Sequence, residues 1–125
     1  MARTYTVEID GQRYQGATAS AKNQFEALHI AGRTGLVALL KPDAADMSLV
    51  TLLLQIPFAD VQRLIELLVK GQVVREADSV PVAENLFSDA IHGYYLLLAH
   101  ALRENLGPFW QLRRPTTEGA AEQSQ

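Results

Sequence analysis

Polar and apolar residues alternate over residues 4–15, which read TYTVEIDGQRYQ. Every second residue from Tyr5 to Ile9 is apolar, so these side chains fall on one face of an extended chain. The next two residues, Asp10 and Gly11, supply the positive φ angles that a type I′ turn needs. The pattern predicts a β-hairpin. Because an isolated hairpin is only marginally stable in water, its apolar face must pack on the rest of the chain.

A helical period replaces this alternation after Ser20. Ser20 can cap a helix that begins at residue 21 and continues to residue 41, just before Pro42. Gly32 and Gly35 lie inside the segment and weaken it as a helix, so we expect a break or kink there. Gly32 also has no side chain, which would let a neighbouring element approach closely.

Three shorter segments follow. Residues 48–56 (SLVTLLLQI) predict a short, almost wholly apolar helix. Residues 57–71 predict the next helix, with a proline in its first turn and a glycine just after its C-terminal end. Residues 72–84 contain β-branched residues and a proline, so we expect an extended connection there, with a candidate short strand at Val73 and Val74.

The most apolar helix is predicted over residues 89–106, with Ser88 as its cap and with Gly107 and Pro108 ending it. Its apolar arc is about 200° wide, against the roughly 100° that a one-sided surface helix needs. Such a helix either lies between neighbours in the core or keeps part of its surface for a partner. The central stripe of the arc consists of Ile91, Tyr94, Tyr95, Leu98, Leu102 and Leu106.

Together these elements predict a mainly helical α+β fold, in which an N-terminal β-hairpin packs on a bundle of four to five helices. A single domain is expected over residues 1–114. Residues 115–125 contain no large apolar side chain and are expected to form a disordered tail. The predicted core comprises Phe25, Leu28, Leu36, Leu53, Val61, Leu64, Ile65, Leu68, Tyr95, Leu98 and Leu102.

The composition narrows the class of protein. The 125 residues include 11 basic and 14 acidic side chains, for a net charge of −3, and the densest basic cluster is the pair Arg113 and Arg114. A nucleic-acid-binding surface needs more clustered positive charge than this. The longest unbroken apolar run, residues 94–99, is far shorter than the roughly 20 residues of a membrane span. There is no cysteine and the first residues do not resemble a signal peptide, so we expect a cytoplasmic protein.

No catalytic, cofactor-binding or metal-binding site is predicted. His29, His92 and His100 lack the spacing of metal ligands. The GRTG stretch at residues 32–35 lacks the upstream strand and the lysine of a nucleotide-binding loop, and no serine lies in a nucleophile elbow. We therefore expect a protein that is not an enzyme.

The aromatic residues that follow the last helix are the strongest sign of a partner. Phe109 and Trp110 come directly after the predicted helix end, and aromatic side chains are enriched at protein interfaces. Leu96 and Leu97 fall on the two shoulders of the apolar arc. We predict that Leu96, Leu97, Phe109 and Trp110 contribute to self-association or to partner binding, with core packing as the competing interpretation.

The order of these elements resembles a known family. The stretches YTVEIDGQRYQ, NQFEALHIAGRTGLVALL and VPVAENLFSDAIHGYYLLLAHALRENLGPFW, within residues 4–110, are similar to tail assembly chaperones of long-tailed bacteriophages and prophages. The resemblance implies a non-catalytic protein of the host cytoplasm that is absent from the mature virion. It implies binding to the tape measure protein, which would be kept soluble during tail morphogenesis. Tail tube subunits are a second candidate partner.

Two other classes remain open at this stage. One is a structural tail-completion or connector protein, which would stay in the finished particle. The other is a small helical homo-oligomeric binding module unrelated to phages. A neighbouring gene for a very long tape measure protein would favour the chaperone over both.

Overall fold

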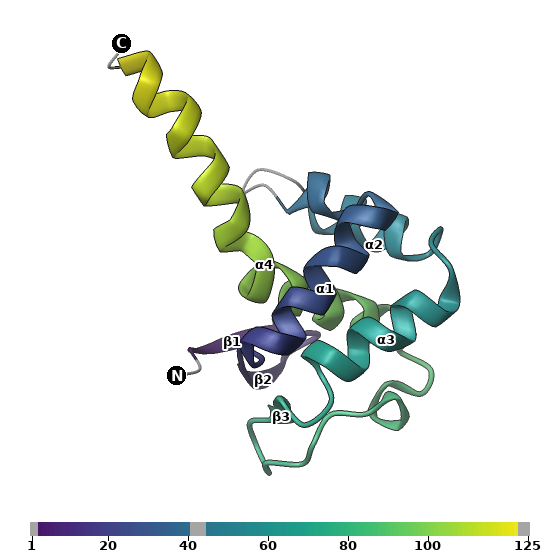
Figure 1. Ribbon diagram of the computed structural model, residues 1–125. Helices are drawn as coiled ribbons and strands as arrows, with labels where there is room; N and C mark the ends of the chain where they lie inside the picture. Colours follow the sequence, from purple (N-terminus) through teal and green to yellow (C-terminus); the bar gives the residue numbers. More distant parts are fainter. Residues whose placement is uncertain (1–2, 41–44, 123–125) are drawn as a thin grey trace.

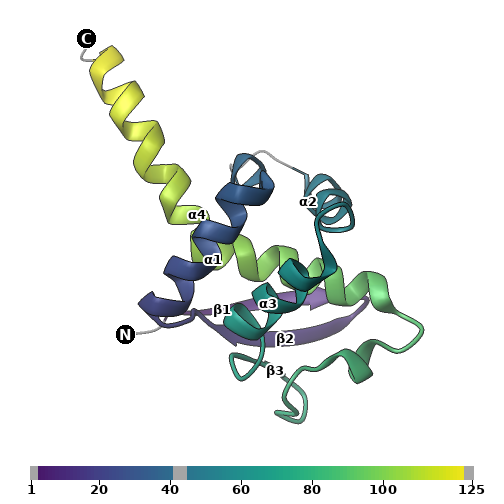
Figure 2. The ribbon, with the colours of Figure 1, turned by 45° about the vertical axis from the view of Figure 1, so that its right-hand side comes forward.

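The computed structural model describes residues 3–40 and 45–122, with side chains up to Gly107. A three-stranded antiparallel sheet forms one layer, and the helices pack on one face of it (Figures 1 and 2). The long last helix crosses this layer of helices and then continues away from the body of the molecule. The predicted mainly helical α+β fold with an N-terminal hairpin is confirmed.

The sheet consists of β1 (Thr4–Ile9), β2 (Gln12–Ala17) and β3 (Val73–Arg75), in the order β1-β2-β3. Asp10 (φ 52°) and Gly11 (φ 80°) form the tight turn between β1 and β2, as the sequence predicts. The alternate apolar residues of β1 are buried against the helices. The candidate short strand is confirmed as β3, which pairs with β2 and extends the hairpin to three strands.

Helix α1 (Ala21–Thr34) begins where predicted, and the Ser20 hydroxyl accepts a hydrogen bond from an amide of its first turn at 3.3 Å. The predicted break occurs at Gly35, whose φ of 87° is left-handed, and the short 3-10 helix η1 (Leu36–Leu39) follows it. Gly32 lies within regular helix, and no atom lies within 4 Å of the position that a Cβ would take there. The close approach expected at Gly32 is therefore wrong.

Helices α2 (Asp46–Leu53) and α3 (Phe58–Leu68) occupy the next two segments predicted as helical, with shifted ends. Pro57 stands just before α3 as its N-cap residue rather than inside its first turn. Gly71, with a left-handed φ of 76°, follows α3 and lets the chain turn toward the sheet.

The face of α1 that packs on α3 is made largely of small residues. Ala27, Ile30 and Ala31 are the buried residues of α1. Phe25 lies on another side of the helix, where it is 67% exposed and its ring meets the edge of the His29 ring at 4.9 Å between centroids. The prediction that Phe25 belongs to the core is wrong, because α1 meets its neighbours through its alanine-containing side.

Helix α4 (Ile91–Glu122) begins later than predicted. The 3-10 helix η2 (Glu84–Phe87) precedes it, and Ser88 ends η2 instead of capping α4. Asp89 then takes a left-handed φ of 66°, which interrupts any helix that would start at this position. The role of Ser88 as the cap of α4 is therefore wrong.

The helical backbone of α4 also continues past the end predicted at Leu106, through Gly107 and Pro108. A proline inside a helix removes the hydrogen bond that its N–H would give to the carbonyl four residues earlier. That carbonyl belongs to Glu104, and the Arg3 guanidinium donates a hydrogen bond to it. The start of the chain thus supplies the missing donor, which the local sequence of α4 does not show.

Residues 115–122 continue the helical backbone of α4, and residues 123–125 lie outside the described residues. A single domain over residues 1–114, followed by a disordered tail over residues 115–125, stays a prediction.

Helix α4 is the central helix of the core. Between Ile91 and Leu106 it packs on β1 and η2 and also on α2 and α3, and the side chains of Leu97, Leu98 and Leu102 are at most 1% exposed. Neighbours on several sides account for its wide apolar arc, in agreement with the core-helix interpretation. Of the predicted core, Leu36, Leu53, Val61, Leu64, Leu68, Leu98 and Leu102 are buried, while Leu28, Ile65 and Tyr95 are partly buried.

Candidate protein-binding groove

Large apolar side chains that are exposed to solvent mark the candidate binding surface. In the described part of the chain they are Phe25, Met47, Leu54, Phe58 and Ile91. Phe58 stands at the start of α3 and is 64% exposed, and Ile91 stands at the start of α4 and is 55% exposed. These two side chains line the same hollow between α3 and α4. Exposed apolar surface of this kind is a common feature of protein-binding sites.

The hollow has a volume of about 160 Å³. A second hollow of about 240 Å³ adjoins it, since Gln62, Ile65, Glu84 and Tyr94 line both. We call the two hollows together the α3/α4 groove. The apolar side chains around the first hollow include Phe58, Val61, Ile65, Ile91, Tyr95 and Leu98.

Aromatic stacking holds Tyr94 at the base of this groove. The Phe87 ring centroid lies 5.2 Å from that of Tyr94 and 5.6 Å from that of Tyr14 in β2. Gly93 allows η2 to approach α4 this closely, because a Cβ at Gly93 would meet the Phe87 ring at 3.1 Å and Ile9 at 3.3 Å. The sheet and η2 therefore fix the base of the groove.

Glu84 is the charged residue that lines the hollow between Phe58 and Ile91. Its side chain is exposed, and its carboxylate takes part in no ion pair or hydrogen bond among the described residues. Burial of the Tyr94 ring, and after it the negative charge of Glu84, raises the pKa of Tyr94. A carboxylate without a partner at an apolar rim favours a ligand that brings a positive charge.

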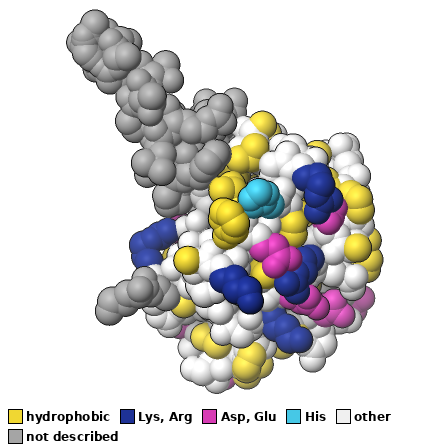
Figure 3. Space-filling model, in the orientation of Figure 1, with side chains coloured by type: hydrophobic (Ala, Val, Ile, Leu, Met, Phe, Trp, Pro, Cys, Tyr) yellow, Lys and Arg dark blue, Asp and Glu magenta, His cyan; other side chains and the backbone are white. Residues whose placement is uncertain are grey.

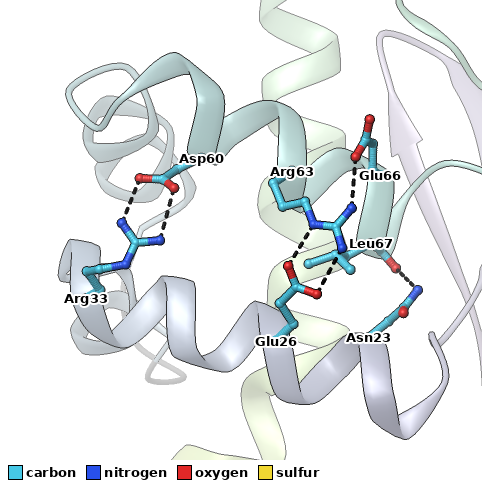
Figure 4. Close-up of polar contacts among 7 residues, drawn as sticks. All are labelled: Asn23, Glu26, Arg33, Asp60, Arg63, Glu66 and Leu67. Carbon is cyan, nitrogen blue, oxygen red and sulfur yellow. Dashed lines mark hydrogen bonds and ion pairs between the residues drawn. The ribbon is translucent and has the colours of Figure 1, made fainter.

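The other flank of α3 has its charges already paired (Figure 4). Arg63 makes a bidentate pair with Glu26 of α1, at 2.7 and 2.9 Å, and also reaches Glu66 at 3.1 Å. Arg33 makes a bidentate pair with Asp60, with both distances at 3.1 Å. The hydrogen bonds from Arg63 lower the pKa of the Glu26 carboxyl. These contacts fix α1 against α3. Of the residues in them, Glu66 also lines the second hollow of the groove, together with Lys70.

The face of the molecule that carries α1 and α3 shows the same pairing (Figure 3). Basic and acidic side chains lie next to one another there, with hydrophobic side chains scattered between them and at the edges of the face. A mixed surface of this kind does not form the continuous positive patch that nucleic acid requires.

The residues predicted to form the interaction surface are found in different settings. Leu97 is completely buried, so the folded chain does not offer it to a partner. Leu96 is half-buried and packs against the core. The side chains of Phe109 and Trp110 lie outside the described residues. A role for Leu96, Phe109 and Trp110 in binding therefore stays a prediction.

The histidines do not come together. His92 Nε2 lies 2.9 Å from Asp10 Oδ2, His100 Nε2 lies 3.6 Å from Asp46 Oδ2, and His29 is on α1. Among residues 3–40 and 45–107, whose side chains the structure describes, no group of three or more potential ligands is placed to hold a metal ion. Within the same ranges, no helix combines the length and the apolar character needed to cross a membrane.

The sequence did not reveal the groove as a site. Ile91 falls in the central apolar stripe of the last predicted helix, Phe58 stands near the start of the helix predicted over residues 57–71, and Glu84 falls in a segment predicted only as a connection. Each of the two apolar residues stands in the first turn of its helix, and its side chain is exposed. The position of both residues at the start of a helix was the feature of the sequence that could have indicated their exposure.

Comparison with known protein families identifies the family of the chain. Residues 10–117 match the family of phage tail assembly chaperone proteins (TAC). No curated protein and no solved structure matches the chain. The match covers most of the 125 residues and includes nearly all of the elements described above. The chain therefore belongs to the phage tail assembly chaperone family.

Proposed function

We propose that this chaperone binds the tape measure protein through the α3/α4 groove and keeps it soluble in the host cytoplasm until the tail tube assembles. The observation that carries the proposal is the placement of two large exposed apolar side chains, Phe58 and Ile91, on one hollow. Family membership supports a role in tail assembly.

The chemistry of the groove suits an amphipathic helical segment. Phe58 and Ile91 offer apolar contacts at the rim, and the half-buried Ile65 and Tyr95 continue this surface inward. Covering one large apolar side chain contributes about 1.5–3 kcal/mol, so a few such contacts hold a segment reversibly. A chaperone that must later release its client needs binding of this kind, and the binding requires no catalytic step.

Co-expression with the tape measure protein of the same phage tests the proposal. The wild-type chain should raise the amount of tape measure protein in the soluble fraction and should co-purify with it. Phe58→Asp and Ile91→Asp should each abolish this effect, because a carboxylate at the rim opposes burial of an apolar segment. Both positions are exposed, so these variants should keep the wild-type circular dichroism spectrum.

Phe25→Asp is the matched control. Phe25 is 67% exposed against 64% for Phe58, and each residue lies near the start of its helix, but Phe25 does not line the groove. The control should behave as wild type. Equal loss of tape measure solubility with Phe25→Asp and Phe58→Asp would count against the groove, and no increase with the wild-type chain would count against the function itself.

A further inference from the structure

The C-terminal part of α4 carries a sequence that complements the groove. Residues 109–114 read FWQLRR, in which two aromatic residues are each followed four positions later by an arginine. Four residues is the spacing that places two side chains on one face of a helix. The backbone of α4 is helical over this segment and runs away from the body of the molecule (Figures 1 and 2).

The segment cannot reach the groove of its own chain. The groove is formed at the start of α4, where Ile91 lies, and Trp110 comes 19 positions later on the same continuous helix. At about 1.5 Å per residue these two positions are about 28 Å apart along the helix axis. Any contact between the segment and a groove must therefore involve two chains.

The two surfaces match in character and in charge. The hollow between Phe58 and Ile91 is apolar except for Gln62 and the carboxylate of Glu84. The segment offers aromatic side chains for the hollow and guanidinium groups for Glu84. Arginine and carboxylate groups form strong bidentate pairs, and aromatic residues and arginine are the residues that most often dominate binding at interfaces.

We propose that residues 109–114 of a second copy of this chain occupy the α3/α4 groove, so that the free chaperone self-associates. Two reciprocal insertions close a dimer, since each copy has one groove and one segment. The aromatic residues enter the hollow and Arg113 or Arg114 pairs with Glu84. This inference does not depend on tape measure binding. If the proposed function is also correct, the tape measure segment competes with the second copy for the same groove.

Sedimentation equilibrium of the full chain over a hundredfold range of concentration tests the inference. The wild-type mass should rise from 13.8 kDa toward twice that value as concentration increases. The double variant Phe109→Ala with Trp110→Ala should stay at the monomer mass throughout. Glu84→Arg should weaken self-association at least tenfold, and so should Arg113→Glu with Arg114→Glu.

Combining Glu84→Arg with Arg113→Glu and Arg114→Glu should recover most of the lost affinity, because the charges are exchanged between the two surfaces. Glu8→Arg is the matched control, since Glu8 is an exposed carboxylate on β1 that does not line the groove. It should self-associate as wild type. Circular dichroism of every variant distinguishes unfolding of the chain from loss of the contact between the two copies.

The inference would be overturned by a wild-type chain that stays monomeric, by self-association that resists both the aromatic and the charge variants, or by an exchange of charges that recovers nothing. If Phe58→Asp abolishes tape measure binding but leaves self-association intact, the groove serves the tape measure protein alone. If self-association behaves as expected while the wild-type chain fails to solubilise the tape measure protein, the proposed function is wrong and the dimer contact stands.

Discussion

Gly16 shows how one residue can fix the packing of the sheet on the helices. It pairs with Tyr5 across β1 and β2, and the Tyr5 ring lies over the glycine so closely that a Cβ there would stand 2.4 Å from Cζ of the ring. The Tyr5 side chain is itself buried, so its ring has little room to move. The glycine is required by this close approach.

Gly16→Ala should therefore lower the free energy of unfolding by about 1–3 kcal/mol, the usual cost of overpacking. Gly32→Ala is the opposite case, because Gly32 is a helical residue with no atom near the new methyl group, and it should stabilise the protein by about 0.5–1 kcal/mol. Urea unfolding of both variants shows whether the free energy of unfolding falls for Gly16→Ala and rises for Gly32→Ala. Equal effects of the two substitutions would show that the Tyr5 ring can move aside.

The Tyr5 hydroxyl has a second consequence, in the pH dependence of stability. Burial, and after it the charge of Glu104, raises the pKa of Tyr5 from 10.0 to about 12. Since the pKa is higher in the folded chain than in the unfolded one, the unfolded chain ionises first. The contribution of Tyr5 to stability is complete below pH 10 and is lost as the pH rises toward 12.

Between pH 10 and pH 12, the free energy of unfolding of Tyr5→Phe should therefore fall by about 2 kcal/mol less than that of the wild type. Below pH 10 the variant should be as stable as the wild type or slightly more stable, because the buried hydroxyl has no hydrogen-bond partner among the described residues. Urea unfolding of the two proteins just below pH 10 and near pH 12 provides the measurement. Equal losses of stability in both proteins would show that groups other than Tyr5 cause the alkaline sensitivity.

At the scale of the elements, the central position of α4 determines which of its leucines tolerate a charged substitution. Leu97 has no exposed surface, while Leu96, one residue earlier, is half-buried. Leu97→Glu would place an unpaired carboxylate in the core, which costs several kcal/mol and is a large share of the total stability of a domain this size. We expect this variant to lose its helical circular dichroism signal, whereas Leu96→Glu should remain folded. A folded, monomeric Leu97→Glu protein would instead make Leu97 an interface residue.

The continuity of α4 depends on an element far away in sequence. The Arg3 guanidinium binds the Glu104 carbonyl that Pro108 leaves without a partner, and it also pairs with the Glu104 carboxylate at 2.6 Å. Arg3→Met removes both contacts and should speed hydrogen exchange several-fold in α4 after Glu104, with little change before it. Arg13→Met, which removes an exposed pair with Glu76, is the control and should leave exchange in α4 unchanged.

The elements that the sequence predicts correctly are those whose signals are local. The Asp10 and Gly11 turn, the Ser20 cap and the break at Gly35 each depend on the backbone preferences of one or two residues. The predictions are wrong where the structure depends on residues that are distant in the sequence. Pro108 predicted a helix end because the contribution of Arg3 lies about a hundred residues away in the chain. Periodicity likewise placed Phe25 in the core, although its side chain is 67% exposed.

At the scale of the whole molecule, one helix joins the two surfaces for which we propose a role in binding. Helix α4 forms a wall of the groove at its start, passes through the core, and ends in the segment that leaves the body (Figure 2). The core between them is closed on the sheet by β1 and on the helical side by α2 and α3. The molecule therefore has a packed core, with a groove at one end of α4 and a projecting helix at the other.

This construction leads to a prediction about the finished particle. The groove offers few apolar anchors, each contributing about 1.5–3 kcal/mol before the cost of association is subtracted. The complex with the tape measure protein should therefore dissociate readily, and tube subunits that cover the tape measure protein should shift the equilibrium toward free chaperone by mass action. Mass spectrometry should detect the chain in infected-cell lysate but at less than one copy per purified virion. Stoichiometric copies that survive a high-salt wash of the particles would identify a structural tail protein instead, because a component that stays in place needs a larger and more permanent interface than this groove provides.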